Sequence, residues 1–498
     1  MTARKPCPEA PGPLEDYARR FDGDFESLAQ RRAFREYLQG LLLPRDRNKT
    51  LTALANAEPV VAAQHAAVQR LQFFLSESRW DAEAVNARRL ALLLDDPATA
   101  PHGDGVLVVD DSGDRKDGRA TDHVARQYLG SVGKTDNGIV AVTTLWADER
   151  VYYPLHAVPY APAPRLPLGK LDPAFHTKPQ LAADLVAAAR AAGVPFRAVV
   201  ADSFYGDNLG FEEALLAAGV PFVLALRPSK GTWAPIEAAH TPEDAARLLR
   251  WSGPRKPRSP GDWTRVRRRF RDGHTETWWA ADARLAGYGP DRTVRLVAAT
   301  TDPKTLPPLT TWYLATNLPH PLHPTPRRGA RGARGARPTA PPFPPADLAE
   351  VVRLYGLRNW VEQGYKQVKG ELGWADFQVR ADRAIRRHWT LVTCAFSFCW
   401  RPPTPTPTAP PATPIPPASA TTTGRGEKAP AAAGSPRAAL VAGGAARGTR
   451  LAHAVGTPAA LLARMVQRAP TATTPCAPRR HRRRPAALPL PPALTNYR

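Results

Sequence analysis

Residues 106–110 read Val-Leu-Val-Val-Asp, and residues 198–202 read Ala-Val-Val-Ala-Asp. Each stretch is an apolar run that ends in an aspartate, and a short continuous apolar run predicts a strand buried on both faces. Residues 178–192, which lie between the two runs, have the pattern of a helix. We therefore predict one α/β sheet with Asp110 and Asp202 at the ends of two strands, where open α/β sheets build their sites.

The whole segment from residue 101 to residue 229 is predicted to form the main part of this sheet. Three strands come first, followed by helix, strand, helix and strand, an order compatible with a mixed α/β sheet. The predicted elements are strands at 106–109, 124–128 and 139–146, a turn-rich segment at 133–138, a helix at 178–192, a strand at 198–201, a helix at 209–218 and a strand at 221–226.

Residues 1–100 are predicted to be helical. Apolar residues recur at three- and four-residue spacing in segments 25–43, 53–71 and 82–94. Basic residues cluster on and just after the first of these segments. Either a DNA-binding helical region or a solvated basic face explains this cluster, and both interpretations stay open.

Two further regions follow the predicted sheet. Residues 230–345 contain six tryptophans and have β-favouring runs at 293–300 and 311–315, which predict an inserted, mostly β subdomain. A basic, Gly/Pro-rich stretch lies at 327–337. Helical patterning returns from residue 346 to about residue 373, and we assign residues 346–400 to the core again.

Residues 401–498 differ from the rest of the chain. They contain nineteen prolines and one aromatic residue, Tyr497. Such a segment cannot bury enough apolar surface to offset its ordering entropy, so we predict a disordered tail. The change is abrupt and interrupts an apolar helical pattern at 391–400, which raises the hypothesis that the tail is a frameshifted remnant.

The composition favours a polyanionic partner. Formal net charge is +23, and the tail with fourteen Lys/Arg and one acid supplies about +13 of it. This balance points to nucleic acid before membrane. No run approaches 18 consecutive apolar residues and no signal peptide is visible, so we expect no membrane segment and a cytoplasmic, nucleoid-associated protein. Four scattered cysteines predict neither a disulfide framework nor a zinc site.

Residues 355–369 place four chemically distinct side chains on one predicted helix face. At ~100° per residue, Tyr355, Arg358, Glu362 and Lys369 fall within a stripe roughly 60° wide. A carboxylate beside a phenol, a guanidinium and an ammonium suits a metal ion next to a phosphodiester. An amphipathic helix with solvated charges is the alternative interpretation.

Asp110, Asp202 and Glu362 are the candidate metal ligands. Three converging carboxylates would repel one another unless cations neutralise them, and oxygen-only ligands select Mg²⁺ or Mn²⁺ over zinc. Two such ions, about 4 Å apart, can activate a water or hydroxyl and stabilise the leaving oxygen of a phosphoryl displacement. The sequence therefore predicts a site for two divalent ions.

Three blocks of the sequence carry a family resemblance that covers about residues 20–400. Asp110-Asp111-Ser112-Gly113, with Ala125-Arg126-Gln127-Tyr128 and Gly133-Lys134, resembles the first-aspartate block of bacterial insertion-sequence transposases of the DDE superfamily. Val200-Ala201-Asp202-Ser203 resembles their second-aspartate block. Tyr355, Arg358, Glu362 and Lys369 match the Tyr-x2-Arg-x3-Glu-x6-Lys signature of the branch that carries a β insertion.

The resemblance implies a ribonuclease H-like core that cuts double-stranded DNA at element ends and joins the freed 3′-hydroxyl to target DNA. It implies that Asp110, Asp202 and Glu362 are the catalytic, metal-binding acids. Of the adjacent Asp110 and Asp111, we choose Asp110, because it directly follows the apolar run and precedes Ser112 by two positions. Phosphates of the element end are implied contacts of three residues: Tyr355, Arg358 and Lys369.

Two alternatives to an active transposase are compatible with the sequence. One is a truncated or frameshifted remnant that binds element ends without completing the reaction. The other is a nuclease with the same core that cleaves DNA without joining it. A homodimer is implied only by the family's need to bring two element ends together.

Overall fold

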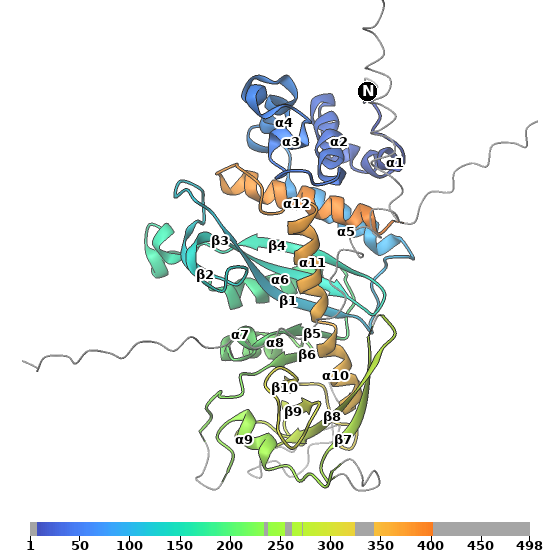
Figure 1. The fold of residues 1–498 in the computed structure, drawn as a ribbon, viewed down its shortest axis with the longest axis vertical. Coiled ribbons are helices and arrows are strands. Elements are labelled where there is room, and N and C mark those ends of the chain that lie inside the picture. Colours follow the sequence, from blue (N-terminus) through green and yellow to red (C-terminus); the bar gives the residue numbers. More distant parts are fainter. Residues whose placement is uncertain (1–6, 234–237, 254–260, 271, 324–342, 402–498) are drawn as a thin grey trace, which may run out of the picture.

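A large mixed sheet organises the protein, seen in a computed structural model that describes residues 7–233, 238–253, 261–270, 272–323 and 343–401 (Figure 1). Apart from Arg401, the predicted disordered tail lies outside the described residues, as does the basic stretch at 327–337. The strands are β1 (Val106–Arg115), β2 (Ala125–Leu129), β3 (Lys134–Ala147), β4 (Tyr152–Pro159), β5 (Ala198–Ala201), β6 (Phe222–Ala225), β7 (Thr264–Arg269), β8 (Thr275–Ala283), β9 (Arg295–Thr300) and β10 (Thr311–Thr316). In the described residues they are hydrogen-bonded in the order β2-β3-β1-β5-β6-β10-β9-β8-β7, with β4 paired to β3.

Helices precede, interrupt and follow the sheet. They are α1 (Pro13–Arg19), α2 (Leu28–Leu42), α3 (Leu51–Leu54), α4 (Ala66–Ser76), α5 (Ala82–Asp95), α6 (Lys178–Ala191), α7 (Ser203–Gly206), α8 (Leu209–Ala217), α9 (Pro242–Arg247), α10 (Leu348–Gly356), α11 (Asn359–Gly370) and α12 (Asp382–Cys399). In the part of the chain that the structure describes, no helix is both long and apolar enough to cross a membrane.

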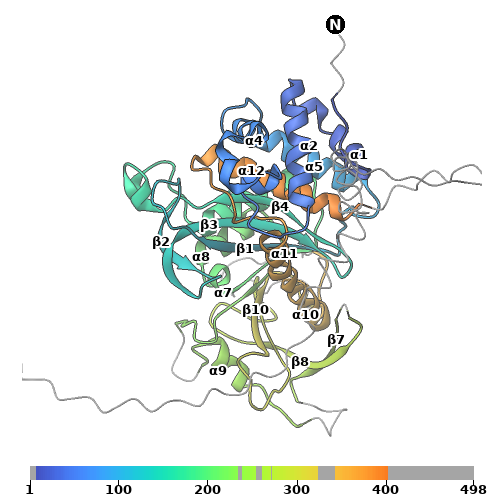
Figure 2. The same ribbon diagram turned by 45° about the horizontal axis from the view of Figure 1, so that its top comes forward.

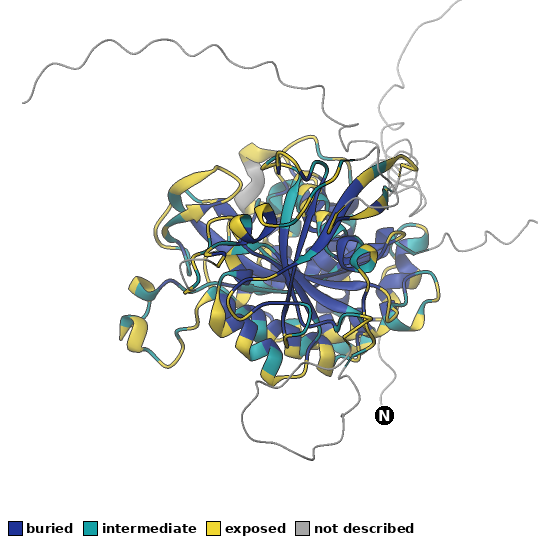
Figure 3. Ribbon diagram, turned by 90° about the horizontal axis from the view of Figure 1, so that it is seen from below, coloured by how far each residue is buried: buried dark blue, intermediate teal, exposed yellow. Residues whose placement is uncertain are grey.

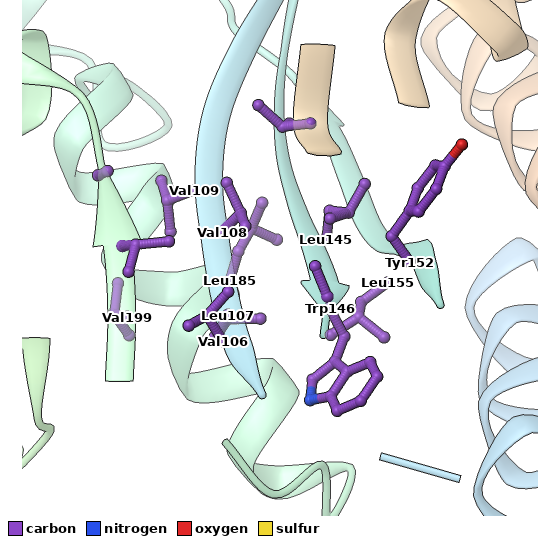
Figure 4. Close-up of a cluster of buried hydrophobic side chains, with 14 of the residues drawn as sticks. Val106, Leu107, Val108, Val109, Leu145, Trp146, Tyr152, Leu155, Leu185 and Val199 are labelled. Atoms are coloured by element: carbon purple, nitrogen blue, oxygen red, sulfur yellow. The ribbon is translucent and has the colours of Figure 1, made fainter. Parts of the chain in front are cut away.

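The two apolar runs are neighbouring parallel strands, as their sequences predict. β1 pairs with β5 from Val106 opposite Ala198 to Val109 opposite Ala201. All of these side chains are buried, and they form the centre of the hydrophobic core (Figures 3 and 4). The parallel pairing stops there, and Asp110 and Asp202 are the next residues of the two chains, where β1 and β5 separate.

The prediction that the first strand ends before Asp110 is wrong. β1 continues to Arg115, because β3 remains paired with it in antiparallel register from Asp110 opposite Thr143 to Arg115 opposite Gly138. The predicted turn at 133–138 is also wrong beyond Gly133, since β3 begins at Lys134 and pairs there with β2. The pairing of β3 with β1 and β2 satisfies backbone groups that a turn would have left to solvent.

Strand β4 was not predicted from the sequence. Its signal is weakened by Pro154, which cannot donate a ladder hydrogen bond. β4 pairs only with β3 among the described strands, and the β3–β4 register shifts between Thr144 and Leu145, next to the proline. A proline is tolerated at such an edge and irregularity.

The insertion is mostly β, as predicted, and its strands extend the core sheet. β10 pairs with β6 in antiparallel register, and β9, β8 and β7 follow outward. Trp278 and Trp312 pack against each other with their ring centroids 4.4 Å apart. Most tryptophans of the insertion therefore pack in a hydrophobic core that is continuous with that of the main sheet.

The N-terminal helices join the core through α12. Helix α12 lies beside α5, between α2 and α4 on one side and β4 on the other (Figures 1 and 2). Most of its residues are buried, including His388 and Trp389. The prediction of one helix at 53–71 is wrong, because Asn56, with a φ of 51°, and Pro59 separate α3 from α4.

His388 makes the stability of this region depend on pH. Its ring is fully buried, accepts a hydrogen bond from the Tyr37 hydroxyl at 2.7 Å and donates one to the Gly373 carbonyl at 3.0 Å. Burial lowers the pKa of His388 to about 4, so the unfolded chain takes up a proton first as the pH falls. Its contribution is complete above about pH 6.5 and is lost between there and pH 4.

Replacing His388 should therefore lower the free energy of unfolding by less at pH 5 than at pH 7. We expect the difference in unfolding free energy between wild type and His388→Gln to shrink by about 2 kcal/mol from pH 7 to pH 5. Urea unfolding of both proteins at the two pH values measures this difference. An equal difference at pH 7 and pH 5 would show that the buried imidazole does not titrate as described.

Candidate active site

Asp110 and Asp202 form the floor of the candidate site. Asp110 follows the last β1–β5 pair, and Asp202 caps α7 by accepting a hydrogen bond from the Phe204 amide at 3.0 Å. Burial and the nearby Asp202 carboxylate raise the pKa of Asp110 to about 7, although Arg358 opposes the shift. Burial also raises the pKa of Asp202. Both carboxylates therefore lie where negative charge is disfavoured unless a cation is close.

Asp111 has a different partner from Asp110. Successive side chains of a strand point to opposite faces. The Asp111 carboxylate forms an ion pair at 2.8 Å with Lys178, the first residue of α6. The structure thus places Asp110, and not Asp111, next to Arg358.

The segment that carries Glu362 is bent. Helix α10 ends at Gly356 and α11 begins at Asn359, so the prediction of one uninterrupted helix is wrong at Leu357 and Arg358 (Figures 1 and 2). Amides at 358, 360 and 361 bond to carbonyls three residues earlier, which tightens the backbone locally. Leu357 and Arg358 keep helical dihedral angles, so the helical rotation from residue to residue continues through the bend.

Arg358 lies at this bend and contacts all three candidate acids. Its Nη2 atom is 2.9 Å from Asp110 Oδ2 and 3.8 Å from Asp202 Oδ2. Its Nη1 atom is 3.7 Å from Glu362 Oε1. The structure therefore brings Asp110, Asp202 and Glu362 together around one guanidinium.

Glu362 and Tyr355 lie on the two sides of Arg358. The Glu362 side chain is 62% exposed, whereas that of Arg358 is 14% exposed, so Glu362 forms the open rim of the site. Tyr355 packs edge-on against Trp312 of the insertion at 4.9 Å. Burial raises the pKa of Tyr355 to about 12, with the nearby acids adding to the shift, so its hydroxyl keeps its proton at neutral pH.

Lys369 lies at the far end of α11, roughly 16 Å along the helix from Arg358. Its ammonium is 2.6 Å from Asp114 Oδ1 and donates a hydrogen bond to the Gly113 carbonyl at 3.0 Å. Asp114 was not identified from the sequence. The signal was available, because Asp110, Ser112 and Asp114 alternate along β1 and so share one face.

Breaking the Lys369–Asp114 pair should destabilise the protein. Asp114 is 7% exposed, so Lys369→Met would leave a buried carboxylate uncompensated and lower the free energy of unfolding by about 3 kcal/mol. The double variant Lys369→Met/Asp114→Asn should recover much of this loss. Urea unfolding tests the pair, and an equal loss in both variants would contradict it.

The donor chemistry of the site fits a hard divalent cation. Three carboxylates offer oxygen ligands of the kind that Mg²⁺ and Mn²⁺ prefer, and the space between them already holds a positive group. Among the described residues, no three His, Cys, Asp or Glu side chains gather closely enough to hold a metal ion. The guanidinium of Arg358 occupies the centre of the acid cluster instead.

Comparisons with known proteins agree with this architecture. The chain matches the family model described as "DDE superfamily endonuclease" over residues 20–283 and the one described as "Transposase DDE domain" over residues 173–398. It is 32% identical over 378 residues to the probable transposase for insertion sequence element IS701 of Microchaete diplosiphon, which covers 75% of this chain and 84% of that protein. The chain therefore belongs to the DDE superfamily of insertion-sequence transposases.

Proposed function

We propose that this transposase cleaves DNA at the ends of its element and joins the freed 3′-hydroxyl to target DNA, with Asp110, Asp202 and Glu362 as its catalytic acids. The observation that carries the proposal is the meeting of these three carboxylates around Arg358, although they come from β1, the β5–α7 junction and α11. Divalent metal use is general in this family. We propose that Mg²⁺ or Mn²⁺ serves here, as two ions held by the three acids.

Each residue of the site has a role that follows from its environment. Bound divalent ions would lower the pKa of the attacking water or hydroxyl and offset charge on the leaving oxygen. Burial raises the pKa of Asp110 to about 7, so a bound divalent ion would favour its charged form. Tyr355 keeps its proton and can donate a hydrogen bond to a phosphate oxygen, and Arg358 can pair with the same phosphate. Lys369 would reach a phosphate only by leaving Asp114.

A groove with arginines along one wall supports DNA as the partner. The groove, of about 1060 Å³, lies between β7 and the two helices that carry the site, and Arg267, Arg269, Gly356 and Trp360 are among its lining residues. Gly356 and Trp360 lie roughly 160° around the helix axis from Arg358, so the groove flanks the opposite side of α10 and α11. The arginines of β7 therefore offer a second positive surface, on the side of α10 and α11 that faces away from Arg358.

The outward arginines of β7 should contribute to DNA affinity. Arg267 and Arg269 are exposed and form no ion pair with another residue that the structure describes. We expect Arg267→Ser/Arg269→Ser to weaken duplex binding and to reduce the slope of log affinity against log salt by about 2. Fluorescence anisotropy at several salt concentrations measures both quantities.

A control for this experiment removes the same number of positive charges from another part of the surface. Arg190→Ser/Arg247→Ser removes two exposed arginines, on α6 and α9, that do not line the groove. This variant should keep the wild-type slope within experimental error. An identical slope for wild type and both double variants would exclude the groove as a DNA contact.

The proposed reaction is tested with a supercoiled donor plasmid that carries the element ends, in Mg²⁺, with a second plasmid as target. Wild-type protein should nick or cut at the ends and produce joined donor–target molecules. Cleavage without joining would favour a nuclease. Specific end binding without cleavage would favour a DNA-binding remnant.

Joining requires two ends at one target, so we propose a homodimer in the synaptic complex.

A further inference from the structure

Arg358 is the group that offsets the negative charge of the acid cluster in the absence of metal. It is the cation that contacts Asp110, Asp202 and Glu362 together among the residues that the structure describes. Lys178, at the start of α6, is paired with Asp111 instead. Without the guanidinium, the partly buried carboxylates of Asp110 and Asp202 would lie close together uncompensated, which is unfavourable.

A divalent ion and this guanidinium cannot occupy the same place. Ligand oxygens of Mg²⁺ lie at roughly 2.1 Å from the ion. Arg358 Nη2 is already in hydrogen-bond contact with Asp110 Oδ2 and within 3.8 Å of Asp202 Oδ2, so an ion between these oxygens would meet both its volume and its like charge. One positive group must leave before the other binds.

We propose that Arg358 is the built-in counter-ion of the metal-free site, and that a divalent cation binds to Asp110 and Asp202 only as this guanidinium moves out toward the DNA phosphate. The inference rests on the proposed metal-dependent function. Metal binding and phosphate binding would then be coupled. Metal binding releases the guanidinium that contacts the phosphate, and the phosphate draws the guanidinium away from the place that the metal needs. By linkage, DNA would raise the affinity for metal by the same factor as metal raises the affinity for DNA.

The position of Arg358 permits such a movement. It lies at the bend between α10 and α11, where hydrogen bonds to the third preceding carbonyl replace the regular α-helical pattern. Its buried Nε atom has no hydrogen-bond partner, so its present placement leaves one donor unsatisfied. Glu362, on the exposed rim, is free to turn inward when the guanidinium leaves.

Mn²⁺ binding to the full chain without DNA tests the inference. Electron paramagnetic resonance of free Mn²⁺ gives the affinity directly. We expect Arg358→Met to bind Mn²⁺ at least about tenfold more tightly than wild type, because the competing charge is gone. Arg358→Lys should lie closer to wild type. Lys366→Met is the matched control, since it removes one charge from α11 and Lys366 forms no ion pair with another described residue.

Each outcome decides between the possibilities. Equal or weaker Mn²⁺ binding by a folded Arg358→Met, or the same gain in Lys366→Met, overturns the counter-ion role and leaves the proposed function intact. Absence of Mn²⁺ binding in wild type and in all variants overturns the proposed metal site itself. If Arg358→Met does not fold, wild type with an element-end duplex decides. DNA should tighten Mn²⁺ binding several-fold, and an unchanged affinity overturns the coupling.

Discussion

Glu362→Gln is expected to reduce end cleavage by at least about a thousandfold while leaving end binding within about twofold of wild type. The substitution keeps the size of the side chain and removes the negative charge that a metal ligand needs. Because the Glu362 side chain is exposed at the rim, the fold should be unaffected. Cleavage of a supercoiled donor plasmid in Mg²⁺, with anisotropy on the same ends, separates chemistry from binding.

A matched control for this variant is available on α8. Glu213→Gln makes the same chemical change at an exposed acid outside the acid cluster. It should cleave like wild type. Full activity of Glu362→Gln would refute the assignment of Glu362, and equal loss in both variants would point to a nonspecific effect.

Trp389→Ala is expected to lower the free energy of unfolding by about 4 kcal/mol. Trp389 is 1% exposed and stacks on Trp374, with ring centroids 4.8 Å apart and an interplanar angle of 4°. The pair joins α12 to the segment that follows α11, so its loss removes packing from below the site. Trp389→Phe should lose less, because a ring remains to stack.

An exposed tryptophan provides the contrast for the packing prediction. Trp233 is 89% exposed, so Trp233→Ala should change the free energy of unfolding by less than about 0.5 kcal/mol. Urea unfolding of the three variants gives the comparison. Similar losses for Trp389→Ala and Trp233→Ala would contradict the packing of α12 against Trp374.

The central strands and the region of the acids were predictable because local sequence determines them. Two short apolar runs, each ended by an aspartate, are typical of strands inside a sheet, and the parallel pairing of β1 with β5 brings Asp110 beside Asp202. The spacing of Tyr355, Arg358 and Glu362 correctly predicted one face, since the bend preserves the helical course. Family membership was also predictable from these blocks and is confirmed.

The features that were missed depend on contacts distant in sequence. β4 contains Pro154, and only its long pairing with β3 makes it a strand. The length of β1 beyond Asp110 depends on β3 in the same way. The Lys369–Asp114 pair joins residues 255 positions apart, and no local pattern assigns an ammonium to a particular carboxylate. Tertiary structure decides such pairings.

Iron-mediated cleavage of the polypeptide tests the central claim most directly, namely that Asp110, Asp202 and Glu362 share one divalent metal site. Fe²⁺ bound in place of Mg²⁺ produces hydroxyl radicals with ascorbate and peroxide, which cut the nearby backbone. We predict fragments that end near all three residues, suppressed by excess Mg²⁺ and absent in Asp110→Asn. Cuts only at other positions, or cuts at these positions that Mg²⁺ does not suppress, would contradict the account.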